Sequence, residues 1–423
     1  MLVSLPASDI AATDGLPAPP TERRVLAVVR WPVGGIRTHI AYTYPALAEA
    51  GYRFTFVLPE DGSRGAFEQS LTHLPGCEFV EAPRLGTAVR RLLRGRRFGL
   101  IHSHGVTAAV HATVGGMGFG VPHLTTVHDV FRADQFGGSA GWAKRQLLAR
   151  VLRRVGAIAS VTRDVQENLL EYLPAVGRRG GSRLFSIPNG IDTRHYRDAT
   201  PPEGWLRERV GCGKGTAILG FLGRFVEQKG FTHLLQALEV LAREGGRPFH
   251  LVAVGSGDRR SRSEREIAER GLGRHVTLFD FMPDVLPVLR QLDLLVVPSL
   301  WEASSLLSME AMSVGVPVLG SDCVGLREVL AGTPSRQFAT GNVADLARAL
   351  RLELDAPHRG EARAFASAAR ARFDVRQYAL RFAEEFDRMF DPGVRRPAET
   401  RAAIPALGAG WGWRRIATTE GTR

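Results

Sequence analysis

The stretch PSLWEASSLLSMEAMSVGVPVLGSD, residues 298–322, carries most of the information about the fold. An apolar strand ends just before it, and a loop carrying Glu302 follows. A helix is expected over 306–314, with Ser304 and Ser305 as candidate N-caps, because a serine hydroxyl can accept a hydrogen bond from a free amide of the first turn. A second apolar strand closes the stretch. It therefore predicts one strand–helix–strand unit of a parallel sheet.

Two glutamates flank the predicted start of this helix. Glu302 lies in the loop before the helix, and Glu310 lies within it, eight positions later. The backbone N–H groups of Leu306 and Leu307 are expected to be free at the helix N-terminus, where the helix dipole favours a phosphate group. The two carboxylates could therefore flank one elongated ligand. The spacing alone leaves open that both are solvated surface charges.

Outward from this stretch, apolar strands alternate with helical patterns of about 10–15 residues, which predicts βαβ units and parallel sheets. A polar break with two prolines, near 198–204, separates two such runs and predicts two doubly wound α/β domains. Ligands are expected beyond the carboxyl ends of the strands, in an interdomain cleft. The predicted strands cover 25–29, 54–58, 100–102, 124–127, 157–161 and 184–187 in the first run, and 218–222, 251–254, 276–279, 294–297 and 317–320 in the second.

The same pattern divides the chain. Residues 1–23 and 392–423 lack periodicity and are expected to be loose tails. The two domains are expected over 24–200 and 201–372. The predicted helices of the second run cover 232–243, 263–270, 285–292 and 306–314, and a late amphipathic helix over 373–391 is indicated by the spacing of Phe373, Tyr378, Phe382 and Phe386.

Composition narrows the class of protein. With 44% hydrophobic and 23% charged residues, the 423-residue chain is not disordered, and its net charge of +12 favours anionic partners. Cys77, Cys212 and Cys323 form neither a disulfide framework nor a zinc motif, so a reduced, cytosolic chain is expected. The uncharged stretch 105–127 is rich in glycine and predicts a helix, a turn and a strand rather than a membrane span. No secretory signal is visible.

Several motifs occur together in a fixed order. Glu-x7-Glu is followed by Ala-Met-x-x-Gly-x-Pro-Val, and the chain also contains a double glycine at 34–35, TVHD at 126–129, IPNGID at 187–192, GRFVEQKG at 223–230 and VGSG at 254–257. This set resembles the signature of the retaining nucleotide-sugar glycosyltransferases of family 4, which have the GT-B fold. The resemblance implies two Rossmann-like domains, the first binding the acceptor and the second the nucleotide sugar, with the late helix packed back on the first domain.

The resemblance also implies roles for individual residues. Arg224 and Lys229 would neutralise the nucleotide diphosphate, Glu310 would accept bonds from ribose, and Glu302 would contact the transferred sugar. The implied catalytic residues are Arg224, Lys229, Glu302 and His128; the implied donor-binding residues are Gly34, Gly35, Gly223, Arg224, Lys229, Gly255, Ser305, Leu306, Leu307 and Glu310; and the implied acceptor-side residues are Gly35, His128 and Asp129. A surface salt bridge for the two cations and a structural role for His128 remain alternatives.

One tripeptide departs from the family pattern. The family commonly has Gly-Phe-Gly between the first glutamate and the helix, whereas this chain has Ala303, Ser304 and Ser305. Serines can still cap the helix, so phosphate binding is expected to survive. The departure leaves the donor sugar, and the choice among UDP-, GDP- and ADP-sugars, open.

Competing motifs are incomplete. No Asp-x-Asp occurs, which disfavours the metal-dependent glycosyltransferase design, and neither a metal site nor a cofactor is expected. GCGKGT at 211–216 lacks the glycine and the hydroxyl residue of a P-loop. The expected activity is therefore retaining, metal-independent transfer of a sugar from a nucleotide donor to an acceptor hydroxyl in polysaccharide, glycolipid or related glycoconjugate synthesis. Two alternatives stay open: a GT-B epimerase or sugar-phosphate synthase, and a catalytically silent GT-B scaffold.

Two basic clusters suggest a membrane surface. The first contains Arg90, Arg91, Arg94, Arg96 and Arg97, and the second contains Lys144, Arg145, Arg150, Arg153 and Arg154. They could dock the first domain on anionic lipid near a lipid-linked acceptor, or could be solvated helix faces. Nucleic acid is disfavoured because aromatic residues are sparse in both clusters. The expected location is cytoplasmic, with peripheral attachment to the inner face of the membrane left open.

Overall fold

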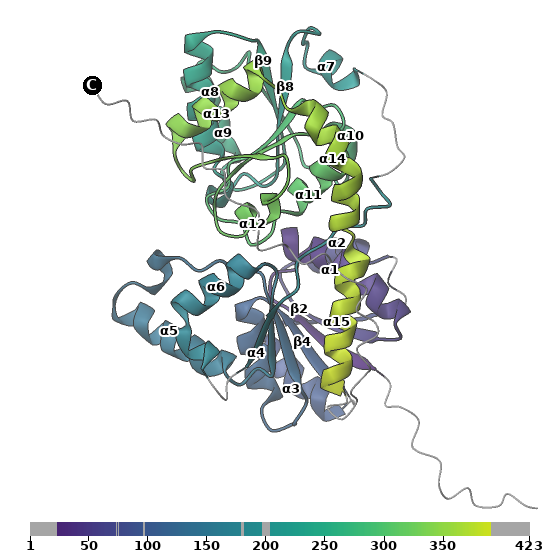
Figure 1. Cartoon of the computed structure of the whole chain (residues 1–423). Helices are drawn as coiled ribbons and strands as arrows, with labels where there is room; N and C mark the ends of the chain where they lie inside the picture. The colour runs from purple at the N-terminus through teal and green to yellow at the C-terminus, as the bar shows by residue number, and fades with distance from the viewer. Residues whose placement is uncertain are drawn as a thin grey trace, which may run out of the picture.

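The computed structural model describes residues 23–72, 74, 76–95, 98–178, 182–196 and 204–390. Both expected tails, apart from Arg23, and most of the proline-containing break lie outside these ranges. The described chain forms two α/β domains, one above the other, with a C-terminal helix that runs down the side of the lower domain (Figure 1). Both sheets are fully parallel, which confirms the predicted fold class.

The N-terminal domain contains a seven-stranded sheet in the order β3-β2-β1-β4-β5-β6-β7. The inner strands of this sheet are almost completely buried on both faces, as in parallel sheets covered by helices, whereas the edge strands β3 and β7 are partly exposed. The strands are β1 Arg24–Val29, β2 Arg53–Pro59, β3 Glu78–Ala82, β4 Leu100–His104, β5 His123–Val127, β6 Ala157–Ser160 and β7 Arg183–Ser186; the helices are α1 Gly34–Glu49, α2 Arg64–Gln69, α3 Leu85–Gly95, α4 Val106–Gly116, α5 Gly138–Leu152 and α6 Arg163–Tyr172, with 3₁₀ turns η1 Ala133–Phe136 and η2 Pro174–Gly177.

The C-terminal domain contains a six-stranded sheet in the order β10-β9-β8-β11-β12-β13. Its strands are β8 Ala217–Leu222, β9 Phe249–Val254, β10 Val276–Phe279, β11 Leu294–Val297, β12 Val318–Ser321 and β13 Arg336–Phe338; its helices are α7 Trp205–Arg209, α8 Phe231–Glu244, α9 Arg260–Glu269, α10 Leu286–Leu289, α11 Leu306–Ser313, α12 Leu326–Leu330, α13 Val343–Asp355 and α14 Arg359–Arg372, with the 3₁₀ turn η3 Glu227–Lys229. The last helix, α15 Val375–Phe390, belongs spatially to the other domain.

Three differences from the predicted elements have local causes. The strands β3 and β13 were not expected; both lie at sheet edges, where partly exposed residues interrupt the apolar run. The helix expected over 285–292 is only the four-residue α10. Pro287 lacks an N–H and fits only in the first helical turn, and Leu292 leaves the helix to pack over the glycine face of β8 at Gly220.

Each sheet reverses its winding once. The reversal falls between β1 and β4 in the first domain and between β8 and β11 in the second. In open α/β sheets, ligands bind outside the carboxyl ends of the strands at such a switch point. The loops that follow β1, β4, β8 and β11 are therefore the places where this fold favours a ligand.

The chain passes between the domains twice, and the two passages pair with each other. The amide of Ile191 donates to the carbonyl of Phe373 at 2.8 Å, and the amide of Val375 donates to the carbonyl of Ile191 at 3.0 Å. A Cβ on Gly190 would lie 2.6 Å from the Cα of Val375. Gly190, in the IPNGID motif, is therefore required by the close crossing of two backbones.

The helix α15 is anchored by aromatic side chains. Tyr378, Phe382 and Phe386 belong to the same hydrophobic cluster as the buried residues of β1 and β2. Tyr52 of the first domain donates a hydrogen bond to the carbonyl of Ala383 at 3.1 Å. No helix in the described ranges is long and apolar enough to cross a bilayer.

We predict that Phe386→Ala destabilises the protein by about 3–5 kcal/mol, because Phe386 is fully buried. The centroid of its ring lies 5.2 Å from the ring centroids of both Tyr52 and His102. Leu380→Ala on the same helix is the matched control, since Leu380 is 65% exposed, and should change stability by less than about 0.5 kcal/mol. Urea unfolding followed by circular dichroism measures both variants. Equal effects of the two substitutions would show that α15 is not anchored by this face.

Candidate active site

The switch points of the two domains meet at the domain boundary. The helix α1 begins at Gly34, directly after β1, and a Cβ on Gly34 would lie 3.8 Å from Nε of Arg224, in the loop after β8. Gly35 is exposed, and a Cβ there would meet no atom within 4 Å. The amino end of α1 thus faces a cation of the other domain, with open space beside it.

The helix α11 offers a second amino end at this boundary. Ser305 is its N-cap, and its hydroxyl oxygen accepts a hydrogen bond from the amide of Ser308 at 3.3 Å. Ser304, the other candidate cap, instead has a buried hydroxyl with no partner within the described ranges. Capping through Ser308 leaves the amides of Leu306 and Leu307 in the first helical turn, where intrahelical acceptors are lacking and an anion is favoured.

The two expected phosphate-binding cations differ in their surroundings. Lys229 forms an ion pair with Glu302, the glutamate expected to contact the sugar, and the hydroxyl of Ser299 donates to the same carboxylate oxygen at 3.3 Å. Arg224 is exposed, and its guanidinium has no ion-pair partner in the described part of the chain. Arg224 is therefore available to bind an anion directly. Lys229 can bind an anion only if its ion pair with Glu302 breaks.

Glycines allow the loops of the second domain to pack closely. Gly230 has φ +65°, and a Cβ there would lie 1.9 Å from the carbonyl oxygen of Pro298. Gly255 has φ +150°, and a Cβ there would lie 1.9 Å from the carbonyl oxygen of Gly223. Both conformations favour glycine. The structure thus gives Gly255 a packing role, holding the loop that carries Arg224 and Lys229.

Glu310 is held by two tyrosines. Its side chain is 8% exposed, and Oε1 accepts a hydrogen bond from the hydroxyl of Tyr42, on α1 of the other domain, at 3.3 Å. The hydroxyls of Tyr42 and Tyr196 lie 3.2 Å apart. Burial raises the pKa of Glu310, while hydrogen bonds from Tyr196 and Tyr42 oppose that rise. Burial also raises the pKa of both tyrosines, so both hydroxyls stay protonated and can donate.

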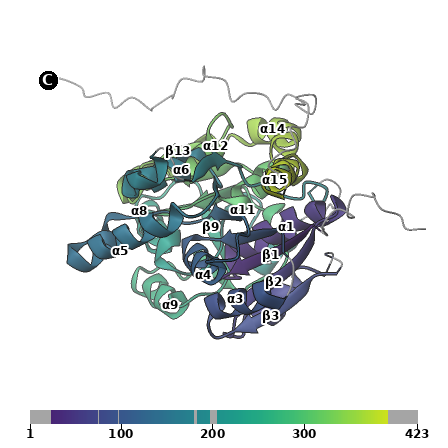
Figure 2. The same cartoon turned by 90° about the horizontal axis from the view of Figure 1, so that it is seen from below.

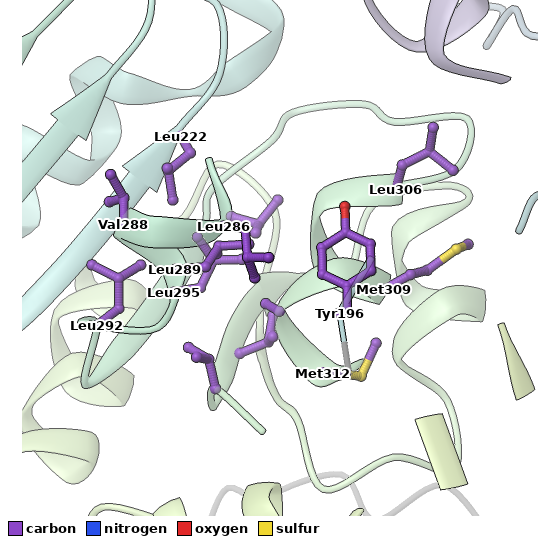
Figure 3. Packing of buried hydrophobic residues seen from close by; sticks show 14 of the residues in the cluster. Tyr196, Leu222, Leu286, Val288, Leu289, Leu292, Leu295, Leu306, Met309 and Met312 are labelled. Atoms are coloured by element: carbon purple, nitrogen blue, oxygen red, sulfur yellow. The ribbon is translucent and has the colours of Figure 1, made fainter. Parts of the chain in front are cut away.

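Tyr196 is fixed by the core of the second domain. It is 4% exposed and belongs to a cluster that contains leucines of α10 and methionines of α11. In Figure 3 its ring lies between Leu286 and Leu289 on one side and Met309 and Met312 on the other. The hydroxyl of Tyr196 is therefore a rigid part of the Glu310 site.

His128 lies at the carboxyl end of β5, in a group of histidines. Its Nε2 lies 3.3 Å from Nδ1 of His104, and its ring centroid lies 4.9 Å from that of His39. Burial lowers the pKa of all three, that of His39 to about 4, so the imidazoles are neutral at pH 7. A neutral His128 can accept or donate one hydrogen bond at the domain boundary but carries no charge.

The carboxylate of Asp129 forms a hydrogen bond with the first turn of α4. Its Oδ2 accepts a hydrogen bond from the amide of Val106 at 2.8 Å. Burial raises the pKa of this carboxyl, and the amide bond opposes the rise. Asp129 therefore stabilises a helix end next to His128, and its expected place on the acceptor side rests on the sequence motif.

The domains are also joined by a reciprocal contact of helix ends. Asp164, at the start of α6, accepts hydrogen bonds from the amide of Gly325 at 3.1 Å and from Nε of Arg327 at 2.8 Å. In return Glu328 accepts one from the amide of Asp164 at 2.8 Å. The carbonyl of Ala303, in the tripeptide that departs from the family pattern, accepts a bond from Thr162 at 3.1 Å. These contacts hold the two domains together beside the switch points.

Sequence reasoning missed four residues at this site: Tyr42, Tyr196, His39 and His104. One signal was available for the histidines, because His102 and His104 are two apart in a strand and so share a face. No local signal links Tyr42 to Glu310, which are 268 positions apart. The structure brings Gly34 and Arg224 together, and Lys229 and Glu302 together; His128 and Asp129 lie on the first-domain side.

Two family models match consecutive parts of the chain. The model described as Glycosyltransferase Family 4 matches residues 33–195, and the model described as Glycosyl transferases group 1 matches residues 206–372. The first range covers the strands β2 to β7 of the first sheet, and the second range covers all six strands of the second sheet.

Among curated relatives, the chain is 32% identical over 247 residues to 2-deoxystreptamine glucosyltransferase of Streptomyces kanamyceticus. That alignment covers 56% of this chain and 62% of the relative, so less than two thirds of the relative is matched. The chain is also 29% identical over 286 residues to D-inositol 3-phosphate glycosyltransferase of Nocardia farcinica, covering 64% of this chain and 63% of the relative.

Solved structures share the fold. HepE of Anabaena, in complex with UDP and glucose, superposes with a TM-score of 0.72 at 19% identity and covers 86% of this chain and 99% of its own. Sucrose-phosphate synthase of Thermosynechococcus elongatus superposes with a TM-score of 0.70 at 19% identity, over 87% and 99%. With both halves of the sequence matched in order and both domains superposed, the chain belongs to the family 4 glycosyltransferases with the GT-B fold.

Proposed function

We propose that this protein is a retaining glycosyltransferase that moves a sugar from a nucleoside diphosphate sugar to an acceptor hydroxyl. The observation that carries the proposal is the convergence, at the facing switch points, of one exposed arginine, one lysine, two helix amino ends and two glutamates. This set matches the parts of such a donor. The cations and helix ends suit its diphosphate, and the two glutamates suit its two sugar rings.

The proposed binding mode assigns one ring to each glutamate. Glu310, beside the rigid Tyr196, accepts bonds from the ribose hydroxyls in place of the hydroxyl of Tyr42. The diphosphate lies between Arg224 and the amino end of α11, and competes with Glu302 for Lys229. Glu302, released from Lys229, accepts bonds from the transferred sugar. The loop at Gly35 leaves room for a backbone approach to the diphosphate.

The proposed reaction needs no protein nucleophile and no metal ion. The bond from the anomeric carbon to the diphosphate breaks while the acceptor oxygen attacks from the same face. The proton of the acceptor hydroxyl passes to an oxygen of the departing phosphate. Arg224, Lys229 and the helix amino end stabilise the charge that develops on the leaving group, the kind of contribution that is worth about 10²–10³ in rate per donor. His128 is neutral and is proposed to bond a sugar hydroxyl.

The donor and the acceptor are proposed by class. HepE of Anabaena was solved with UDP and glucose, which supports a UDP-sugar as the first donor to test. The relative from Streptomyces kanamyceticus is named for 2-deoxystreptamine and the relative from Nocardia farcinica for D-inositol 3-phosphate, which supports testing a small polyol acceptor beside a lipid-linked one. A sugar-phosphate synthase would require a phosphorylated acceptor, an epimerase would need no acceptor, and a silent scaffold would neither transfer nor hydrolyse the donor.

We also propose that the first domain docks on an anionic membrane. On α3, Arg90, Arg91 and Arg94 are exposed while Leu92 and Leu93 are buried. The helices α3, α4 and α5 lie on the side of the molecule seen in Figure 2. Arg96 and Arg97 lie outside the described residues.

The two basic clusters converge at Met117. Arg90 donates a hydrogen bond to the carbonyl of Met117 at 3.4 Å, and Arg154 lies 3.9 Å from its sulfur. Trp142 and Leu147 of α5 are 64% and 57% exposed. Cations beside exposed apolar side chains suit a lipid surface, where the cations meet headgroups and the apolar groups enter the boundary layer.

We predict that Glu310→Gln and Glu302→Gln affect different steps. Glu310→Gln should weaken binding of free UDP by about 1.5–3 kcal/mol, the value of a hydrogen bond to a charged group. Glu302→Gln should lower the turnover rate more than it weakens UDP binding, because contacts to the reacting ring strengthen in the transition state. Calorimetry with UDP and transfer kinetics measure the two effects, with exposed Glu361→Gln as the control.

The same assay tests the rest of the proposal. Transfer should persist in excess chelator, and nuclear magnetic resonance of the product should show the anomeric configuration of the donor. Wild-type UDP affinity in Glu310→Gln would overturn the assignment of the ribose site. Loss of transfer in chelator, restored by Mn²⁺ or Mg²⁺, would overturn the metal-independent route.

We predict that Tyr42→Phe binds UDP about 2–10-fold more tightly than wild type, because it removes one hydrogen bond that the ribose must displace from Glu310. Tyr378→Phe is the matched control, since its hydroxyl donates to the carbonyl of Arg372 at 2.7 Å, away from Glu310. Calorimetry compares the two variants. Weaker UDP binding in Tyr42→Phe would mean that the hydroxyl of Tyr42 binds the nucleotide instead of being displaced from Glu310 by the ribose.

We predict that changing Arg90, Arg91 and Arg94 to Gln weakens binding to anionic vesicles by up to about 1 kcal/mol per charge. The control variant changes Arg209, Arg265 and Arg363 to Gln, which removes the same charge from exposed positions of the second domain. Sedimentation with phosphatidylserine vesicles at low salt compares the variants. If both bind as tightly as wild type, α3 is a solvated face.

A further inference from the structure

Three histidines converge at the switch point of the first domain. His39 comes from α1, His104 from the end of β4, and His128 from the residues after β5. One ligand nitrogen of each lies within 4.8 Å of the others. No other group of three potential ligand side chains is arranged in this way within the described ranges. His39 and His104 are buried, and His128 is partly exposed at the domain boundary.

The nitrogen positions approach those of a metal site. Zinc–nitrogen distances of about 2.0–2.1 Å place two nitrogens of one tetrahedral ion about 3.3 Å apart. Nδ1 of His104 and Nε2 of His128 lie at 3.3 Å. Nε2 of His39 is buried and makes no hydrogen bond of good geometry within the described ranges, although the side chain of Asn189 acts on this ring as a hydrogen-bond partner and opposes the fall of its pKa. A buried nitrogen without a well-formed bond is unfavourable unless something else binds it.

The surrounding residues orient these rings. The hydroxyl of Tyr44 lies 2.8 Å from Nε2 of His104 and 2.8 Å from Nδ1 of His102. The other nitrogen of His102 lies 2.8 Å from the hydroxyl of Thr126. A hydrogen bond to the second nitrogen fixes the ring and tautomer of a metal-binding histidine. His104 therefore has an outer partner at Nε2, and its Nδ1 points toward Nε2 of His128, where an ion would replace their hydrogen bond.

We propose that His39, His104 and His128 bind one Zn²⁺ ion, with a fourth position open to the domain boundary. Three neutral imidazoles suit zinc and related late transition metals, whereas Mg²⁺ and Ca²⁺ need oxygen ligands. The ion is not part of the transfer reaction. Because it occupies a nitrogen of His128, it inhibits transfer, a consequence that rests on the function proposed above.

Direct metal binding tests the site independently of any activity. Co²⁺, which reports tetrahedral coordination by its visible absorption, is titrated into the purified full chain and then displaced by Zn²⁺. We expect one ion per chain and three nitrogen ligands at about 2.0 Å by X-ray absorption of the zinc form. His39→Phe should weaken binding by at least about 100-fold, since even a lost outer partner costs about 10–100-fold.

Two further variants secure the result. His128→Gln removes a ligand at the partly exposed end of the cluster and should weaken binding as strongly as His39→Phe. His111→Phe on α4 changes a partly buried histidine outside the cluster and should bind as wild type does. Absence of a tetrahedral Co²⁺ spectrum in wild type, or unchanged binding in folded His39→Phe and His128→Gln, would overturn the site.

The inhibitory consequence has its own measurement. The ratio of the transfer rate in chelator to the rate in Zn²⁺ should be well above one for wild type and should fall toward one for His39→Phe. A ratio of one in wild type carrying bound Zn²⁺ would overturn inhibition. Co²⁺ binding by the three histidines without transfer under any condition would instead count against the proposed function and leave the site standing.

Discussion

The paired crossing between the domains is the constraint on which the rest of the structure depends. Ile191 bonds to the segment around Asp374, and Gly190 has no room for a Cβ against Val375. The segment in which the chain leaves the first domain, around Ile191, is therefore fixed to the segment in which it returns, around Asp374. Since α15 then packs into the core of the first domain, the two sheets are held with their switch points facing. The arrangement of the candidate site follows from this geometry.

Apart from Arg224, the charged groups of the proposed ligand-binding site already have partners in this structure. Lys229 holds Glu302, and Tyr42 holds Glu310. These pairs lie at the domain boundary, which the hydrogen bonds of Asp164 with Gly325 and Arg327 also hold together. On the proposed function, binding of a nucleotide sugar is an exchange of partners. Its affinity is then set by the difference between new and displaced hydrogen bonds, which is smaller than the sum of the new ones.

Local patterns predicted much of the fold. Apolar runs located eleven of the strands, and the serine pair before 306–313 located the cap of α11, because both depend on neighbours in sequence. The edge strands β3 and β13 were missed, since partly exposed strands lack a continuous apolar run. The tyrosines around Glu310 and the histidines around His128 come from separate elements. The spacing of His102 and His104 indicates a shared strand face, but only the tertiary structure brings His39 and His128 to that face and Tyr42 to Glu310.

The central claim is that a nucleoside diphosphate binds where the two switch points meet. Hydrogen–deuterium exchange, with and without saturating UDP, GDP or ADP, tests this directly because it reports backbone amides along the whole described chain. We expect slower exchange at the amino ends of α1 and α11 and in the loop 223–230 with at least one nucleotide. Unchanged exchange in these three segments with all three nucleotides, or protection confined to other parts of the chain, would contradict it.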